Sequence, residues 1–508
     1  MNIAGHIERA ARHFPGQPAI LFEGEAAISY RDLRQRVQQV AGGLAAAGVQ
    51  PGDRVALFLP NTPSFVIAYQ ACQWLGAITV SANVMLTTEE LRYLLEDSGA
   101  RLAFTTEALW PALAPLAAKH LGDLSRVVLC EGAVAGTTPL AAFGLGASTP
   151  PLAFREKDDP AAILYTSGTT GKQKGATLSI GNVVSNMEAT RQYMRVDPDD
   201  RLLLFLPLFH VFGQNFIMNA AFAAGAAVVL HRRFDREGVL ASIVRDRVTM
   251  FFAVPTIFIM LLDSGIRRED MPGVRYFFSA AATMPVEVAE RWKAIFQSPV
   301  YEGYGLSETS PFASYNHEWH HRPGSVGAAI ANVDLRIVDP EDHEVPSGTW
   351  GEICIKGPNV MLGYWNRPSE SAEALRGGWF HTGDVGYMDE DGFVFIVDRT
   401  KDMINAAGFK VWPREVEEVL YQHPAVGECA VYGAPDPVKG EVPLAAVVLA
   451  AGAATTAAEL EAYCRERLAA YKVPRGFDLV PALPKSATGK ILKRVLRDEV
   501  ARQPVSGR

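Results

Sequence analysis

Residues 165–175 combine the side-chain types that hold phosphate groups in proteins. Seven of these eleven residues are Gly, Ser or Thr, and two more are Lys. Glycines let the backbone turn its N–H groups toward one centre, hydroxyls add hydrogen-bond donors and lysines add positive charge. The run is not a Walker A loop, because only two residues separate Gly168 from Gly171 and Gln173 stands where Ser or Thr would bind magnesium. A flexible, solvated loop would have the same composition, so the rest of the chain has to support the phosphate-binding interpretation.

A second stretch, residues 301–309, places small residues next to an aromatic ring and a carboxylate. Its glycines would let a ligand lie against the backbone, and Tyr304 offers a ring for a base such as adenine. Glu308 offers a hard oxygen ligand for magnesium. Burying a Glu charge without a partner costs free energy, so a Glu that follows a Gly-rich turn suggests a bound cation. Together, the two stretches predict a nucleotide site.

Three further residues are candidates because of their neighbours. His210 lies among aromatic residues at the end of an apolar run, where a histidine is most often a packed core residue. Asp384 follows Gly383, and a carboxylate there can accept hydrogen bonds from ribose hydroxyls, although Asp after Gly is also a common turn residue. Lys490 follows Gly489, which would extend its reach into a cleft; otherwise it would be a solvated surface lysine.

Residues 317–321 match the H-E-x-x-H pattern of zinc proteases, but a zinc site is not expected there. The motif needs a continuous helix, and Pro323 and Gly324 follow it at once. A surface loop is the better interpretation. The five cysteines lie far apart without a CxxC pair, which suggests neither a zinc site nor a disulfide framework.

Composition places the chain among ordinary globular proteins and excludes several partners. The 508 residues predict one large domain plus a smaller one, or about three domain-sized units. With 48 Lys and Arg against 56 Asp and Glu, the net charge of −8 gives no global attraction for nucleic acid or anionic membranes. No apolar run approaches about 18 residues, so no membrane span is expected, and peripheral membrane contact stays open. The scattered cysteines and the lack of an apolar signal core predict a cytoplasmic protein, either a monomer or a homodimer.

The chain alternates helix and strand signals, which predicts parallel sheets covered by helices. Leu33, Val37, Val40 and Leu44 recur at helical spacing. Residues 132–151 are rich in Ala, Gly, Thr and Pro and are expected to form a surface connection. A charged joint at residues 398–402 precedes a small α+β unit.

Six segments, in order, resemble signatures of the adenylate-forming superfamily, which includes acyl-CoA synthetases, adenylation domains and luciferases. They lie at residues 165–175, 278–282, 301–309, 363–368, 378–384 and 484–490. The chain departs from the pattern at Ala280, where the family usually has Gly. The resemblance covers nearly the whole chain. It implies an α/β fold with a large N-terminal ATP- and acyl-binding domain at residues 1–398 and a small mobile α+β domain at residues 399–508.

By resemblance to acyl-CoA synthetases, the chain would convert a carboxylic acid to acyl-AMP, release pyrophosphate and transfer the acyl group to coenzyme A or another thiol. Magnesium would be held by Glu308, adenine would lie beside Tyr304, and Lys490 would bridge the carboxylate and the α-phosphate. The resemblance implies the following cofactor-binding residues: Thr166, Ser167, Gly168, Thr169, Thr170, Gly171, Lys172, Lys174, Glu302, Gly303, Tyr304, Ser307, Asp384 and Arg399. The implied catalytic residues are Lys490, Glu308 and His210; the implied substrate-binding residues are His210, Val211, Phe212, Asn215, Gly303 and Ala280.

We expect a medium- or long-chain fatty acid as substrate, because residues 209–216 and 257–262 are mainly apolar and contain no Lys or Arg. Aromatic acids are the rival, since His210 and its Phe neighbours suit a ring equally well. An amino-acid-activating enzyme would usually carry an Asp near His210, and residues 202–225 contain none. A dicarboxylate ligase would need an added Arg near Glu302, where this chain has Gly303. A nucleotide sensor without turnover is disfavoured by the presence of both Lys490 and Glu308.

The superfamily rotates its small domain between the two half-reactions about the second residue after the Arg of the joint. Counted from Arg399, that residue is Lys401. The resemblance therefore predicts a hinge at Lys401.

Overall fold

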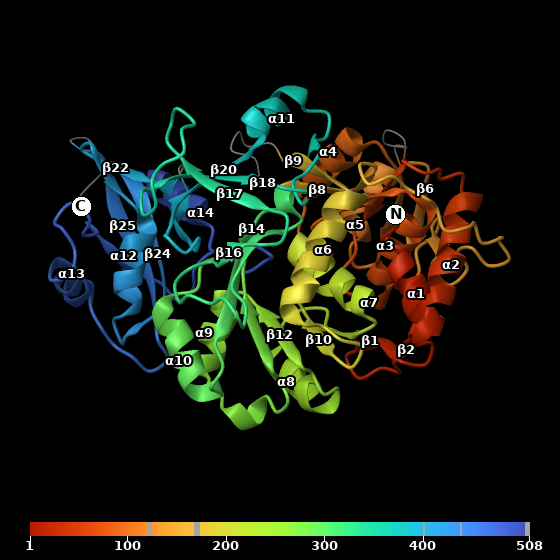
Figure 1. The fold of residues 1–508 in the computed structure, drawn as a ribbon, viewed down its shortest axis with the longest axis horizontal. Coiled ribbons are helices and arrows are strands. Elements are labelled where there is room, and N and C mark those ends of the chain that lie inside the picture. The colour runs from red at the N-terminus through yellow and green to blue at the C-terminus, as the bar shows by residue number, and fades with distance from the viewer. Residues whose placement is uncertain (119–123, 167–172, 400–401, 437–438, 503–508) are drawn as a thin grey trace.

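The computed structural model describes residues 1–118, 124–166, 173–399, 402–436 and 439–502. Two large sheets form the N-terminal part, a four-stranded sheet follows, and a small α+β unit occupies the other end of the molecule (Figure 1). This is the predicted fold class. The boundary at residue 398 stays a prediction.

The first large sheet has eight strands, which are parallel from β8 to β7 and antiparallel at β9 and β19. In spatial order they are β19 (Gly363–Tyr364), β9 (Lys174–Ser179), β8 (Pro160–Thr166), β4 (Ile78–Ser81), β3 (Arg54–Leu57), β5 (Ala100–Thr105), β6 (Arg126–Leu129) and β7 (Thr138–Pro139). Its helices are α2 (Tyr30–Ala46), α3 (Pro63–Leu75), α4 (Thr88–Ser98), α5 (Trp110–Ala117) and α6 (Ile180–Met194).

The second large sheet has nine strands, and its central strands from β14 to β1 are parallel. The order is β16 (Ala328–Ala329), β15 (Phe312–Tyr315), β14 (Val300–Gly305), β13 (Tyr276–Ser279), β12 (Met250–Ala253), β10 (Arg201–Leu204), β11 (Ala227–Leu230), β1 (Pro18–Phe22) and β2 (Ile28–Ser29). Its helical segments are α1 (Gly5–His13), the π-helix η1 (Phe212–Asn219), α7 (Ala220–Ala224), α8 (Arg236–Arg245), α9 (Pro255–Asp263), η2 (Arg268–Asp270), α10 (Val286–Phe296) and η3 (Ser307–Thr309).

The four-stranded sheet is antiparallel and joins the large part to the small unit. It consists of β17 (Asp334–Val338), β18 (Gly351–Lys356), β20 (Phe380–Met388) and β21 (Val394–Arg399), with the short helices α11 (Pro368–Ala374) and η4 (Arg376–Gly378).

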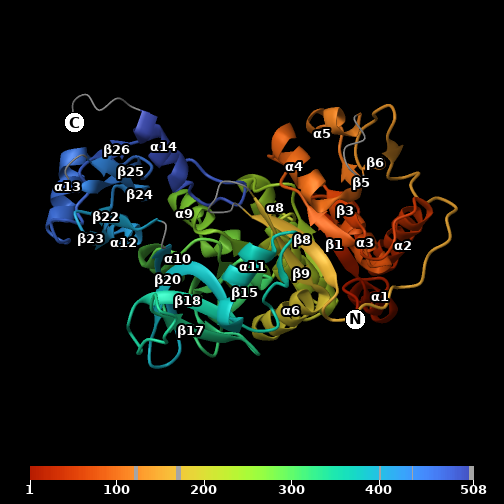
Figure 2. The ribbon, with the colours of Figure 1, turned by 90° about the horizontal axis from the view of Figure 1, so that it is seen from above.

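The small unit packs around its own apolar core, which includes Val416, Leu420, Val431 and Leu460. Its strands are β22 (Ile404–Ala406), β23 (Phe409–Val411), β24 (Val426–Asp436), β25 (Gly440–Leu449) and β26 (Phe477–Leu479), and its helices are α12 (Pro413–Tyr421), α13 (Ala457–Arg465) and α14 (Lys493–Arg502). Figure 2 shows the chain before α14 leaving the small unit toward the large part.

Local signals account for most helix boundaries. Ser29 caps α2, where its hydroxyl accepts a hydrogen bond from the Asp32 N–H, and the four predicted apolar positions of this helix are buried. Thr87 and Thr456 form capping boxes with Glu90 and Glu459 at the starts of α4 and α13.

The segment 132–151 is not only the surface connection that its composition predicts. Phe143 is buried, and its ring lies edge-on to Phe104 with centroids 6.0 Å apart. Residues 138–139 add the edge strand β7 to the sheet. A single aromatic side chain anchors this segment, and composition averaged over 20 residues hides such an anchor.

A buried carboxylate ties together the amino ends of three neighbouring strands in the second sheet. Asp200 directly precedes β10 and accepts hydrogen bonds from Thr249 Oγ1 at 2.7 Å and from Arg275 Nη2 at 2.6 Å. Thr249 and Arg275 in turn directly precede β12 and β13. One buried acceptor thus fixes the ends of the strands opposite the edge at which the candidate site lies.

We predict that Asp200→Ala lowers the free energy of unfolding by about 1–3 kcal/mol, because it removes the buried acceptor of the Thr249 hydroxyl and the Arg275 guanidinium. The measurement is the midpoint of urea unfolding. The exposed neighbour Asp199→Ala is the control and should unfold as the unmodified protein does. Equal midpoints for both variants would contradict the prediction.

Candidate functional site

Four of the predicted site residues lie at or beyond the carboxyl ends of parallel strands in the two large sheets. His210 follows β10, Ala280 directly follows β13, Tyr304 lies in β14 and Thr166 ends β8. In α/β sheets the carboxyl edge is where ligands bind, because loops from neighbouring strands converge there.

Asp384 joins two other candidate residues, Tyr304 and Arg399. Its side chain is buried; Oδ2 accepts a hydrogen bond from Tyr304 Oη at 2.7 Å, and Oδ1 lies 3.1 Å from Arg399 Nε. Burial, and then the Asp384 charge, raises the pKa of Tyr304 well above its usual range, so the phenol stays a donor. The carboxylate keeps acceptor sites beyond those that Tyr304 and Arg399 occupy.

Glu308 is buried on η3 among oxygen and cation groups of the other sheet. Its Oε1 accepts a hydrogen bond from Tyr364 Oη at 3.0 Å and lies 3.5 Å from Thr166 Oγ1. Lys174 Nζ lies 5.2 Å from the centre of the Tyr364 ring. Burial raises the pKa of Glu308. A carboxylate and a hydroxyl at this spacing suit magnesium, which prefers oxygen ligands.

The six central residues of the predicted phosphate loop, Ser167, Gly168, Thr169, Thr170, Gly171 and Lys172, lie outside the described residues, as does the predicted hinge residue Lys401. The two ends of the loop, Thr166 and Lys174, face Glu308 and Tyr364 respectively. Tyr364 was not among the predicted site residues, although residues 363–368 were recognised as a motif.

Lys490 of the small unit lies close to His210 of the large part. Burial lowers the pKa of His210 to about 4, and the positive charge of Lys490 contributes to this shift. Gly489 has a φ of 80°, and a Cβ added there would lie 2.9 Å from Val254 Cγ2. The turn before Lys490 is therefore seated against the loop that follows β12, and only a residue without a side chain fits this approach.

The predicted acyl-binding residues Val211, Phe212 and Asn215 are buried on and beside η1. Asn215 Nδ2 donates to the Ser310 carbonyl at 3.4 Å, and Asn215 Oδ1 accepts from Asn219 Nδ2 at 3.3 Å. A π-helical segment is uncommon and frequently marks a functional site.

The Phe212 side chain forms part of an aromatic cluster. Its ring centroid lies 5.6–6.0 Å from those of Phe216, Phe278 and Phe312. Phe216 and Phe312 are packed more tightly, with centroids 4.4 Å apart. We call these four phenylalanines the aromatic wall.

Gly303 and Ala280 lie beside this wall. A Cβ added at Gly303 would lie 2.8 Å from Phe278 Cζ and 2.9 Å from Phe312 Cδ1, so the position excludes a side chain. Ala280 is buried, and its methyl group takes space that Gly would leave open. The residues 257–262, which we expected to help line the pocket, belong to α9, where Phe258 packs on Phe251 and Trp292.

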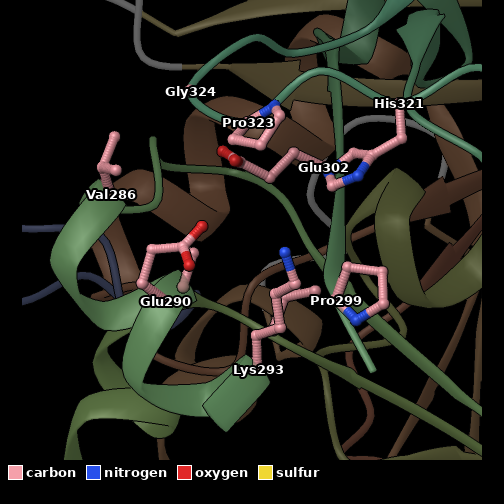
Figure 3. Close-up of a pocket in the computed structure, with 10 residues that line it drawn as sticks. Val286, Glu290, Lys293, Pro299, Glu302, His321, Pro323 and Gly324 are labelled. Atoms are coloured by element: carbon pink, nitrogen blue, oxygen red, sulfur yellow. The ribbon is translucent and has the colours of Figure 1, made fainter. Parts of the chain in front are cut away.

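Glu302 borders a small pocket between α10 and residues 321–324 (Figure 3). Glu290 and Lys293 of α10 and His321 line the same pocket, and the Glu302 carboxyl points toward Pro323 (Figure 3). Glu302 Oε2 accepts a hydrogen bond from the Met284 N–H at 3.2 Å. Burial raises the pKa of Glu302 to about 8, against the opposing charge of Arg414, so its carboxyl is largely neutral at pH 7. Ser307, also predicted to bind cofactor, begins η3 and is partly exposed.

The H-E-x-x-H segment is a loop, as predicted. The backbones of His317 and His320 pair with each other, and the His317 ring stacks on Tyr193 with centroids 4.6 Å apart. The segment is therefore not helical, and the motif's two histidines, His317 and His321, do not share a helix face. Within the described ranges, no helix combines the length and the apolar character that crossing a bilayer would require.

Comparison with known proteins agrees with this geometry. The family model "AMP-binding enzyme" matches residues 7–365, and "AMP-binding enzyme C-terminal domain" matches residues 415–490. A feruloyl-CoA synthase of Amycolatopsis sp is 39% identical over 96% of this chain and 97% of its own length. A long-chain-fatty-acid–CoA ligase of Bacillus subtilis (strain 168) is 36% identical over 96% of this chain and 93% of its own.

Among solved structures, an anthranilate CoA ligase in complex with anthranoyl-AMP aligns with a TM-score of 0.92 at 28% identity, over 98% of this chain and 97% of that one. The predicted fold, the use of ATP, magnesium and coenzyme A, and the AMP-forming ligation of an acid to a thiol are confirmed at the level of the family. The chain belongs to the AMP-binding enzyme family, the adenylate-forming CoA ligases.

Proposed function

We propose that this CoA ligase activates a compact aromatic carboxylic acid, with Phe212 facing the ring. The observation that carries the proposal is the aromatic wall. Carbon atoms in contact lie about 3.5–4.0 Å apart. The 4.4 Å centroid separation of Phe216 and Phe312 therefore leaves no passage between them for a long chain. A flat ring, in contrast, can pack on these edges and faces favourably.

A carboxylate resists attack by a thiol because its leaving group would be oxide, and joining it to AMP supplies a good leaving group. In our proposal Lys490 contacts the carboxylate and the α-phosphate, where negative charge concentrates during adenylation. Its place beside His210 supports this role. Such preorganised charge is the largest single contribution to catalysis in many enzymes.

The nucleotide would be held by residues of all three sheets of the N-terminal part. Asp384 and Arg399 of the four-stranded sheet would bind the ribose hydroxyls, and Thr166 and Lys174 the phosphates; their contacts with Tyr304, Glu308 and Tyr364 support this. Glu308, with Thr166, would hold magnesium, which when bound neutralises phosphate charge. Glu302 would contact adenine, because a neutral carboxyl both donates and accepts hydrogen bonds and so matches an amine next to a ring nitrogen.

The second candidate substrate is the medium- or long-chain fatty acid that the apolar residues 209–216 led us to expect. The similarity to the Bacillus subtilis ligase favours it. Each buried methylene is worth about 0.8 kcal/mol, so a long pocket would raise the catalytic efficiency about fourfold per carbon. The aromatic wall opposes this candidate.

We predict that benzoate or hydroxycinnamate gives at least about tenfold higher kcat/KM than octanoate or palmitate, because the wall rejects extended chains. The measurement is pyrophosphate release with each acid. Phe212→Ala should narrow the difference by removing the ring that faces the aromatic substrate, whereas Phe154→Ala, at an exposed position, should leave it unchanged. If octanoate or palmitate is the better substrate, the aromatic assignment is wrong.

We predict that Lys490→Ala slows acyl-AMP formation by about a hundredfold or more, because it removes the charge that faces the transition state. Binding of ATP should be largely retained, which calorimetry would measure. Lys485→Ala is the matched control, since Lys485 lies in the same segment and pairs with Glu428 at 2.7 Å on the small unit. Adenylation by the Lys490 variant within a few-fold of the unmodified rate would refute the role.

We further propose that Lys401 is the hinge between the two half-reactions. Pro fixes φ near −65° and removes an N–H. Lys401→Pro should therefore form acyl-AMP at a near-normal rate but transfer the acyl group to coenzyme A far more slowly. Single-turnover assays of each step would measure this, with Lys401→Ala as the control that keeps the backbone free. Equal rate losses in both steps would speak against the hinge.

A further inference from the structure

Three side chains of the four-stranded sheet and its turns converge on one ring nitrogen, Nδ1 of His381. His381 Nδ1 lies 3.0 Å from Glu352 Oε2, 3.3 Å from Cys354 Sγ and 3.8 Å from Asp342 Oδ1. The ligand atoms of Glu352, Cys354 and His381 all lie within 4.8 Å of one another. None of these residues belongs to the nucleotide or acyl site proposed above.

The sheet register brings these residues together. Cys354 on β18 and His381 on β20 are direct partners across the antiparallel pair, so their side chains share one face. Glu352 lies two residues before Cys354 and therefore reaches the same face. Asp342 comes from the turn between β17 and β18.

We propose that Cys354, His381, Glu352 and Asp342 form a binding site for a zinc-class divalent cation. Zn–N and Zn–S bonds of about 2.0–2.3 Å in a tetrahedron put neighbouring ligand atoms about 3.3–3.7 Å apart. The separations of 3.0 and 3.3 Å from His381 Nδ1 to Glu352 Oε2 and Cys354 Sγ are close to this, whereas Asp342 lies outside the group whose ligand atoms are all within 4.8 Å and would move inward on binding. Sulfur and imidazole favour zinc or cobalt over magnesium.

The site can be reached from the carboxylate side. Cys354 and the His381 side chain are buried, whereas the Asp342 and Glu352 side chains are 39% and 23% exposed. Arg376 now neutralises these carboxylates, with Nε 3.1 Å from Asp342 Oδ2 and Nη2 3.3 Å from Glu352 Oε2. Its side chain is 35% exposed, so an incoming cation can displace the guanidinium into solvent. The Cys354 thiol would release its proton to water as the metal–sulfur bond forms.

Occupancy of this site would reach the nucleotide site through one hydrogen bond. Glu352 Oε1 accepts the Gly383 N–H at 2.9 Å, and Asp384 is the next residue. A cation that draws the Glu352 carboxylate toward it would shift this turn. This coupling rests on the proposed role of Asp384, whereas the metal site itself does not.

The test is titration of the full-length protein with Co²⁺, in the absence of nucleotide, followed by absorbance. We expect a thiolate-to-cobalt charge-transfer band that saturates at one equivalent and is lost in Cys354→Ser. Cys130→Ser, at the partly exposed cysteine, should retain the band. Asp342→Asn changes an exposed turn and should keep the band while weakening Co²⁺ binding about tenfold.

The proposed metal site would be wrong if the band is absent at millimolar Co²⁺. It would also be wrong if the band persists in folded Cys354→Ser. An unchanged affinity of Asp342→Asn for Co²⁺ would also count against the proposed ligand set. This variant keeps the test decisive if Cys354→Ser does not fold. Acyl-AMP formation with added Zn²⁺ tests the coupling separately. Zn²⁺ should inhibit the unmodified protein more than Cys354→Ser, and equal inhibition of both would reject the coupling.

Discussion

The buried carboxylate of Asp384 is the constraint on which the architecture of the site depends. Its two oxygens are held by Tyr304 from the nine-stranded sheet and by Arg399 from the last strand before the small unit. A buried charge needs partners, and these two partners come from different sheets. Backbone hydrogen bonds between Val394 and residues 326–327 also join the two sheets, and within this contact Asp384 ties Tyr304 to the start of the joint.

Most of the secondary structure could be predicted because its signals are local. The apolar positions of α2 recur within one helix, and the caps at Thr87 and Thr456 act over three residues. The order of the family motifs then indicated the fold, and the structure brings Tyr304, Asp384 and Arg399 together. A motif indicates which residues meet in the site because it contains both the end of a strand and the loop that follows it.

What could not be predicted depends on register and on contacts between distant segments. Tyr364 meets Glu308 across 56 residues, and Cys354 meets His381 only because β18 pairs with β20 in one register. The spacing of the cysteines predicted no zinc site, because only cysteines that lie near one another in sequence give a recognisable zinc pattern. The aromatic wall likewise joins Phe212 to Phe278 and Phe312, which come from different strands, whereas a count of apolar residues cannot distinguish an open channel from a packed one.

The pairing of His210 with Lys490 shows how the site can concentrate charge without self-repulsion. Two cations side by side would destabilise each other and compete for the same carboxylate. Because burial and Lys490 keep the imidazole neutral above about pH 4, only the lysine contributes a positive charge from this pair. His210 Nδ1 accepts the Phe212 N–H at 3.3 Å, so the neutral ring carries its hydrogen on Nε2. In the proposed adenylation step, His210 would therefore orient an acyl oxygen as a neutral donor while Lys490 would neutralise the charge, and the backbone N–H of Phe212 determines which ring nitrogen is the donor.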